Sequence, residues 1–183
     1  MRYELQIRLT EEEYIDFNIF HTTRSPYGQQ SSRRLKWLIA GLFALAVVLS
    51  FVLRGVNEST VLYAVLVALL GGLFLWRFDR FFSRSMKRTV KQMTKTGKKP
   101  YAPESTLIFT EEGILEITPE AKTERQWSSV ERLCLVEGKV WYLYLNSAAA
   151  FILPVAQLDA QTDIGELYRF LEGKCPAVDR FGK

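Results

Sequence analysis

Few side chains of this sequence combine the types and spacing that catalysis requires. His21 is the only histidine, and neither Cys134 nor Cys175 lies in a CxxC or Cys/His cluster with metal-ligand spacing. The serine pair at 128–129 has no histidine in its segment to act as a base. Dinucleotide-binding and P-loop glycine patterns are also missing. The sequence therefore predicts a protein that is not an enzyme, with no cofactor and with both cysteines reduced.

The charged side chains are segregated along the chain. Residues 77–99 carry nine basic groups against one acid, whereas residues 100–183 carry eight basic and thirteen acidic groups. A basic band beside an apolar run is typical of a segment that meets anionic lipid. Because no known binding module accompanies the band, we expect no nucleic-acid partner.

Two uncharged apolar runs, residues 37–53 and 61–76, stand close together in the chain. At about 1.5 Å per residue each would form a helix of about 25 Å, slightly short of a hydrocarbon core of about 30 Å. Neither run has the polar face that a helix of a soluble domain needs, although a buried helical hairpin is the alternative. Trp37 and Trp76 lie at run ends, where interfacial aromatics are common. The pattern favours two membrane spans forming a transmembrane hairpin over residues 37–76.

The flanks of the hairpin predict its orientation. Basic residues stand on both outer flanks, whereas the connecting loop has Arg54 beside Glu58. Because basic flanks remain in the cytoplasm, we expect a multi-pass protein of the cell (plasma) membrane with both termini cytoplasmic. The side chains expected to orient the hairpin and to meet lipid headgroups are Arg33, Arg34, Lys36, Arg77, Arg80, Arg84, Lys87 and Arg88.

The spans themselves look like an anchor. Neither contains the Asp, Glu, Lys, Arg or His that an ion or proton pathway usually needs. Gly71 and Gly72 allow close helix approach, and we expect the second span to pack against the first.

Residues 77–99 are predicted to form a basic juxtamembrane helix, ended by Gly97 and Pro100. Its apolar residues recur at intervals of four, four, four and three, which makes one stripe on a helix. The stripe consists of Phe78, Phe82, Met86, Val90 and Met93. Two placements stay open: the helix lies on anionic lipid, or it continues the second span and packs its stripe on the neighbouring domain.

Residues 1–36 are predicted to form a cytoplasmic strand and a short helix. Apolar and polar residues alternate from Tyr3 to Leu9, as in a half-buried strand. Thr10 and Glu13 have the spacing of a capping box at the start of the helix. Because a single strand cannot stand alone, we expect it to join a sheet of the cytoplasmic domain that follows the hairpin.

Residues 100–183 predict that cytoplasmic domain. Short apolar runs alternate with turn-like clusters, which favours an antiparallel meander. The runs are 107–109, 114–117, 126–127, 132–136, 140–145 and 150–153. A final amphipathic helix, capped by Thr162 and ended by Gly173, should cover the sheet. A small bent antiparallel sheet with one C-terminal capping helix is the architecture of a pleckstrin-homology-like domain, so the predicted fold class is α+β.

Three motifs of this region, "FTEEGI", "WSSVERL" and "AFILP", follow the "TEEEYIDFNIFH" helix and the two-span hairpin. This order of parts resembles the bacterial YcxB-like membrane proteins over nearly the whole chain. The resemblance implies a pleckstrin-homology-like cytoplasmic domain on a membrane hairpin. Its motifs are structural rather than catalytic, so it leaves the activity open.

The sequence favours a membrane-tethered protein-interaction or regulatory module, with an unidentified protein partner. Assembly with copies of the same chain is also open. The alternative is lipid sensing by the β domain at the membrane surface. Recognition of a phosphate headgroup needs clustered Lys and Arg, whereas the candidate loops are the acidic "TEEG" and the mixed "AKTERQ". Headgroup recognition by this domain is therefore less favoured.

Overall fold

The computed structural model of the protein describes residues 1–96, 100–147 and 149–182. Contacts divide the chain into two compact units. The β domain comprises residues 1–17 and 90–183, and the hairpin unit comprises residues 18–89. Gly97, where the sequence predicts a helix end, lies outside the described residues.

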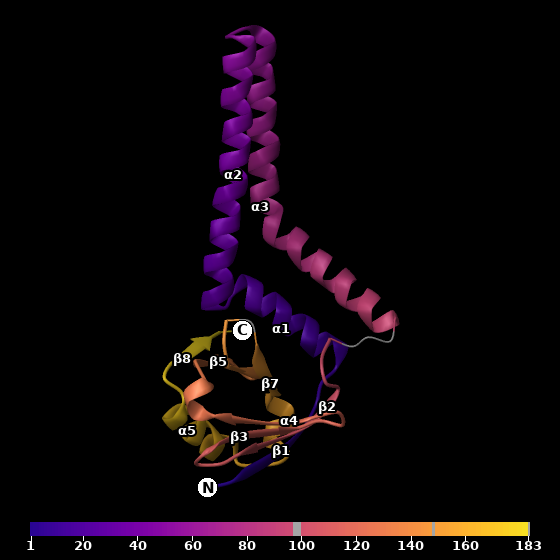
Figure 1. Ribbon diagram of the computed structural model, residues 1–183, viewed down its shortest axis with the longest axis vertical. Helices are drawn as coiled ribbons and strands as arrows, with labels where there is room; N and C mark the ends of the chain where they lie inside the picture. The colour runs from indigo at the N-terminus through magenta and orange to yellow at the C-terminus, as the bar shows by residue number, and fades with distance from the viewer. Residues whose placement is uncertain (97–99, 148, 183) are drawn as a thin grey trace. The chain divides into compact units, whose positions relative to one another are not determined.

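The described part of the β domain contains two four-stranded sheets (Figure 1). The first has the order β1-β2-β3-β4 and the second β7-β6-β5-β8. The strands are β1 (Tyr3–Arg8), β2 (Glu104–Phe109), β3 (Gly113–Ile117), β4 (Lys122–Gln126), β5 (Arg132–Val136), β6 (Val140–Tyr144), β7 (Ala150–Pro154) and β8 (Val178–Phe181). All neighbours are antiparallel except β5 and β8, which run parallel. The meander of strands is thus confirmed, and β8 is an addition that the sequence did not predict.

The strand before the hairpin completes a sheet made after it. β1 pairs antiparallel with β2 from Tyr3 opposite Phe109 to Arg8 opposite Glu104. The capping box then starts α1 (Glu11–Thr23): the Glu13 amide donates to Thr10 Oγ1 at 3.2 Å, and the Thr10 amide donates to Glu13 Oε2 at 2.8 Å. The predicted capping box and the predicted joining of the N-terminal strand to a later sheet are both confirmed.

One apolar core fills the β domain. Leu5, Leu143 and Leu153 come from both sheets and are fully buried. Leu167 and Leu171 of α5 (Ile164–Lys174) belong to the same core, so this helix covers it as predicted. Burial of such side chains supplies most of the driving force for folding.

Both predicted ends of the last helix are wrong. Asp163, not Thr162, caps α5, because its carboxylate accepts hydrogen bonds from the amides of Gly165 and Glu166 at 2.8 and 2.9 Å. An anionic cap is also favoured by the helix dipole. Gly173 lies within the helix, which continues to Lys174.

Two glutamines close the outer edge of β1. The amide group of Gln161 accepts from Gln6 N at 2.7 Å and donates to Gln6 O at 2.9 Å. Gln157, in α4 (Val155–Asp159), makes the same pair of bonds with Arg8, at 2.9 and 2.8 Å. The two side chains therefore satisfy backbone groups that would otherwise be open to another strand.

The step between the two sheets differs from the prediction. Of the run 126–127 only Gln126 lies in a strand, because Trp127 begins a short 3-10 turn, η1 (Trp127–Ser129). The predicted "AKTERQ" loop is mostly strand, since β4 takes in Lys122–Gln126. The Trp127 indole Nε1 donates to Thr110 O at 2.9 Å and its ring stacks on Phe109. The hydrogen bond and the stacking fix this aromatic corner at the rim of the core.

The hairpin unit is built on α2 (Pro26–Arg54) and α3 (Glu58–Lys95), which run side by side from a short loop (Figure 1). Asn57 starts α3 by accepting from the Thr60 amide at 2.9 Å. A Cβ atom built on Gly71 would lie 3.1 Å from the Phe43 ring, whereas one on Gly72 would meet nothing within 4 Å. The predicted packing of the second apolar run against the first is confirmed at Gly71.

The second apolar run and the basic band share one helix. α3 continues without a break through residues 77–95, so the band is a helical extension of the second run. Phe78 is buried, stacks on Phe82 and meets Phe74 edge-on, which starts the predicted stripe. Met93, by contrast, is exposed.

Candidate membrane interface

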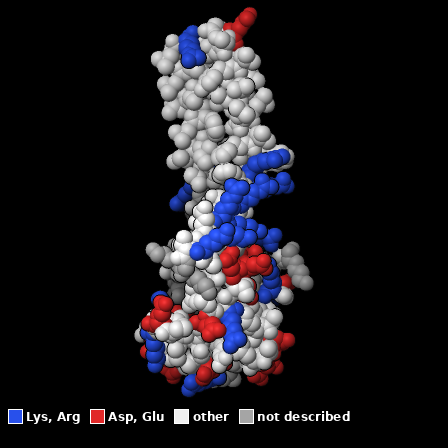
Figure 2. All heavy atoms as spheres, turned by 90° about the vertical axis from the view of Figure 1, so that its right-hand side faces the viewer, with Lys and Arg blue, Asp and Glu red and all other residues white. Residues whose placement is uncertain are grey.

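The hairpin unit turns its apolar side chains outward. The exposed fractions of Leu42, Val52 and Leu69 are 59%, 73% and 69%. In the most apolar windows of α2 and α3, 6% and 11% of residues are buried, and both helices are long and apolar enough to cross a membrane. Figure 2 shows the pair uncharged over most of its length, with charged side chains at its ends. A core helix of a soluble protein buries its apolar side chains, whereas α2 and α3 leave most of theirs exposed.

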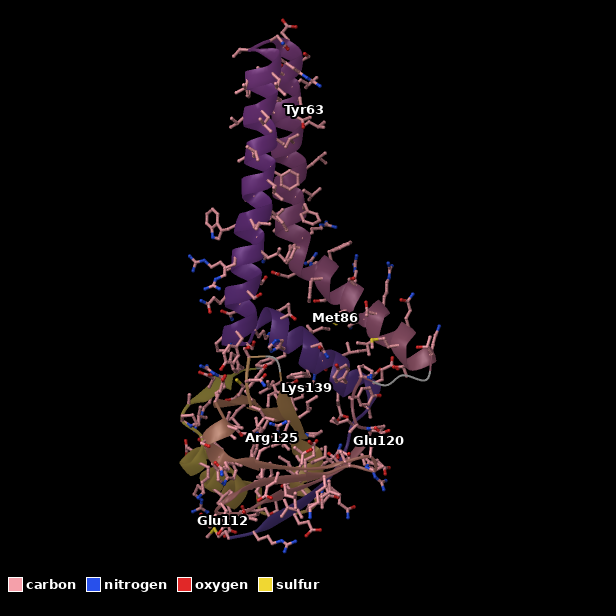
Figure 3. The ribbon with its side chains drawn as sticks, in the orientation of Figure 1. Tyr63, Met86, Glu112, Glu120, Arg125 and Lys139 are labelled. Atoms are coloured by element: carbon pink, nitrogen blue, oxygen red, sulfur yellow. The ribbon has the colours of Figure 1, made fainter. Side chains whose placement is uncertain are left out.

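Aromatic side chains stand near both ends of the apolar band. Because α2 and α3 are antiparallel, Trp37 and Trp76 lie at the same end, 69% and 73% exposed. The Arg77 guanidinium lies 5.5 Å from the centre of the Trp76 ring. Tyr63 projects from α3 near the loop (Figure 3). Amphipathic rings at this spacing are typical of the two interfaces of a bilayer.

The eight predicted headgroup residues all lie beyond the tryptophan end of the apolar band. Those on α2 are Arg33, Arg34 and Lys36, and those on α3 are Arg77, Arg80, Arg84, Lys87 and Arg88. Lys36 joins the two helices: its ammonium lies 2.9 Å from the Asp79 carboxylate and 5.5 Å from the centre of the Phe78 ring.

A groove of about 460 Å³ opens beside this ion pair. Gln29, Ser32, Arg33, Lys36, Trp37 and Ala40 line it from α2, Leu75 and Asp79 line it from α3, and Thr23 completes it. Counted from Gln29, the other α2 residues follow at positions +3, +4, +7, +8 and +11, which is the spacing of one helix face. Arg34 is outside this lining. The groove runs from polar side chains toward apolar ones. Arg33 was predicted from the sequence as a headgroup residue, but the groove that it lines was not predicted.

A tight corner at the start of α2 positions the groove. The Ser25 hydroxyl accepts from the Gly28 amide at 3.0 Å and donates to His21 O at 2.5 Å. A Cβ atom on Gly28 would lie 1.8 Å from His21 O, so the close approach requires glycine. Burial lowers the pKa of His21, which keeps its imidazole neutral at pH 7.

The β domain offers little nucleophilic chemistry. Burial raises the pKa of Cys134 and of Cys175 to about 12, and the Asp179 carboxylate adds to the shift at Cys134. Both thiols are therefore protonated at neutral pH. Across residues 1–96, 100–147 and 149–182, no group of three or more His, Cys, Asp or Glu side chains could hold a metal ion.

A smaller cavity of about 270 Å³ lies within the β domain. Tyr14 and Tyr101 stack at 4.9 Å on its wall, beside Phe151 and Glu116. Glu116 is opposite Leu107 in the sheet and so faces inward, and burial raises the pKa of its carboxyl. Lys139 lies outside this cavity and ties the β5–β6 turn to Asp16 of α1 at 2.5 Å (Figure 3).

Residues 109–171 match the family model described as YcxB-like protein. The matched stretch begins at the end of β2, ends in α5 and contains the "FTEEGI", "WSSVERL" and "AFILP" motifs. Searches of curated proteins and of solved structures each returned no match. The β domain is thus similar to YcxB-like proteins, and the match supports the YcxB-like family for this chain.

Proposed function

We propose that the protein is a multi-pass plasma-membrane protein in which α2 and α3 span the bilayer and both termini are cytoplasmic. The outward-facing apolar surface of the hairpin carries this proposal. Leu53 and Leu69 are 80% and 69% exposed, and many other large apolar side chains on both helices are exposed as well. Soluble monomers rarely expose contiguous apolar patches of more than a few hundred Å². Lipid is the solvent that such side chains suit.

The pairing of β1 with β2 supports an even number of spans. β1 precedes the hairpin and β2 follows it, yet the two strands are hydrogen-bonded neighbours. Both flanks of the hairpin must therefore lie on one side of the membrane. The basic side chains of α2 and α3 at the tryptophan end support a cytoplasmic location for this side.

The β domain, in this proposal, is a pleckstrin-homology-like module that binds a protein partner or regulates one. Two sheets packed on one core with a C-terminal helix support this fold. Lipid sensing by the same domain is less favoured, because the "TEEG" turn remains acidic and its Glu111 already pairs with Lys174 at 2.6 Å. The acidic domain would be repelled by an anionic bilayer.

The proposal includes that the protein is not an enzyme. The Cys134 and Cys175 thiols have pKa values near 12, which does not suit a nucleophile. Chemical crosslinking in native membranes tests whether a protein partner exists. We expect one protein to be recovered reproducibly with the full chain, and to be lost when the exposed β-domain surface is altered. Recovery of lipid alone would contradict an interaction module.

Topology is tested with a reporter that is active only outside the cell. We expect activity when it is inserted after Ser59, in the first turn of α3 beside the hairpin loop, and none when it is fused after Lys183. Activity at Lys183 would overturn the orientation. In parallel, alkaline extraction should leave the unfused protein in the membrane pellet, and its release into the supernatant would contradict spanning.

A further inference from the structure

The groove between α2 and α3 has opposite chemistry at its two ends. Gln29, Ser32 and Arg33 line one end, whereas Trp37, Ala40 and Leu75 line the other. The apolar end is continuous with the outward-facing apolar surface of both helices, where Trp37 is 69% exposed. A phospholipid has the same order of parts, with a charged headgroup joined to an acyl chain.

The charge of the groove favours an anion. Its lining has two basic side chains, Arg33 and Lys36, against one acid, Asp79. Lys36 is held by Asp79 at 2.9 Å, whereas Arg33 forms no ion pair with any of the described residues. A guanidinium presents several donors in a planar fork that suits phosphate. The Ser32 hydroxyl and the Gln29 amide can donate further hydrogen bonds at the same end.

We infer that this groove binds one anionic glycerophospholipid, with its phosphate at Arg33 and an acyl chain along Ala40 and Leu75. The inference rests on the proposed membrane spanning and names the lipid contact that the hairpin makes. The Lys36–Asp79 pair lies between the two ends and fixes the spacing of α2 and α3 beside the lipid. The site therefore joins the two helices through a lipid as well as through protein contacts.

The chain offers a matched control for the headgroup contact. Arg33 and its neighbour Arg34 are both exposed, but Arg33 lines the groove and Arg34 does not. R33Q and R34Q make the same charge change at adjacent residues. Loss of a charge-assisted hydrogen bond to phosphate corresponds to roughly a tenfold loss of affinity. R33Q should therefore weaken binding of phosphatidylglycerol about tenfold, and R34Q should leave it nearly unchanged.

A second pair tests the acyl-chain end. Ala40 lines the groove, whereas Gly41 has nothing within 4 Å of where a Cβ would stand. A40F should fill the groove and displace the lipid, and G41F should not. Inorganic phosphate added at millimolar concentration should fail to compete, because it lacks the acyl chain; effective competition would show that the groove binds a free phosphate and would overturn the lipid assignment.

The measurement is native mass spectrometry of the full chain released from nanodiscs that contain equal phosphatidylglycerol and phosphatidylcholine. One retained phosphatidylglycerol is expected for the wild type, R34Q and G41F, and loss of it for R33Q and A40F. Equal loss in R33Q and R34Q, or no preference for phosphatidylglycerol, would overturn the groove. Alkaline extraction of each variant separates this failure from that of membrane spanning, since a protein that leaves the membrane refutes the proposed function itself.

Discussion

The hairpin unit and the β domain treat the same residue type in opposite ways. Leu69 on α3 is 69% exposed, whereas Leu143 on β6 is fully buried. Leucine gains about 1.5–3 kcal/mol when it leaves water. In the β domain that gain comes from the protein's own core, and in the hairpin unit we propose that it comes from contact with lipid. The exposed fraction of a leucine therefore has a different meaning in the two units, because one unit is surrounded by water and the other, in our proposal, by lipid.

The largest expected difference comes from removing apolar volume. Leu143→Ala should lower the free energy of unfolding of the β domain by about 2–5 kcal/mol, because a cavity remains in a closed core. Leu69→Ala is the matched change in the hairpin unit and should alter stability by less than about 0.5 kcal/mol. Amide exchange in urea, in detergent, measures both when it is followed at β6 for the first variant and at α3 for the second. Equal losses would break the comparison.

Adding a charge should reverse this order, so that the substitution in the hairpin unit is the more damaging one. Leu69→Arg places a guanidinium on the outward face of α3 and should disfavour insertion by about 3 kcal/mol. Ile117→Arg puts the same side chain on a β-domain residue that is 37% exposed and should be tolerated. The fraction of each variant kept in the membrane pellet after alkaline extraction is the readout. If Leu69→Arg inserts as well as the wild type, this face does not meet lipid.

A glycine pair tests the seam inside the hairpin unit. Gly71→Leu should cost about 1–3 kcal/mol, since the new side chain collides with Phe43. Gly72→Leu gains the same helix propensity and meets open space, so its melting temperature should match or exceed that of the wild type. Circular dichroism in detergent distinguishes the two. Similar melting temperatures would mean that Gly71 is not at a close contact.

A smaller effect is expected at the β1 edge. Gln161→Ala removes both partners of the Gln6 peptide group and should cost about 1 kcal/mol. The Gln6 amide should then exchange faster with solvent, while exchange elsewhere in the first sheet changes little. Gln30→Ala, at an exposed position on α2, serves as the control. Unchanged exchange at Gln6 would show that the side-chain amide does not close the edge.

The smallest perturbation is a change of pH. Burial raises the pKa of Cys134 and Cys175 to about 12, so both remain thiols in the folded protein at pH 8. Alkylation by iodoacetamide should be roughly a thousand times slower than for an unfolded cysteine. Because the thiols of the unfolded chain ionise first, their contribution to stability should be unchanged below pH 8 and should fall as the pH rises above about 9. Rapid alkylation of the folded protein at pH 8 would contradict the burial.

Much of the architecture could be predicted because its signals are local or periodic. The uncharged runs at 37–53 and 61–76 predicted two long apolar helices, and the alternation from Tyr3 to Leu9 predicted β1. The pairing of β1 with a sheet after the hairpin followed from the instability of a lone strand. The family match covers "FTEEGI", "WSSVERL" and "AFILP", whereas the "TEEEYIDFNIFH" helix and the hairpin, which were also part of the resemblance, lie outside residues 109–171.

The features that were missed depend on partners distant in the chain. Gln157 and Gln161 close β1 across about 150 residues, and a pair of glutamines has no local signature for that role. β8 was missed because its parallel partner β5 is far away in sequence. The cap at Asp163 was misassigned by one residue, since Thr162 beside it is also a good cap. The groove at Arg33 required the position of α3.

Labelling of single introduced cysteines tests the central claim most directly, because the native thiols should not react. We expect Ser59→Cys, in the first turn of α3 beside the hairpin loop, to be labelled by a membrane-impermeant maleimide on intact cells. Ser147→Cys, exposed in the β6–β7 turn, should be labelled only after the cells are permeabilised. Labelling of Ser147→Cys on intact cells, or of Ser59→Cys only after permeabilisation, would contradict a hairpin that crosses the membrane and holds the β domain inside.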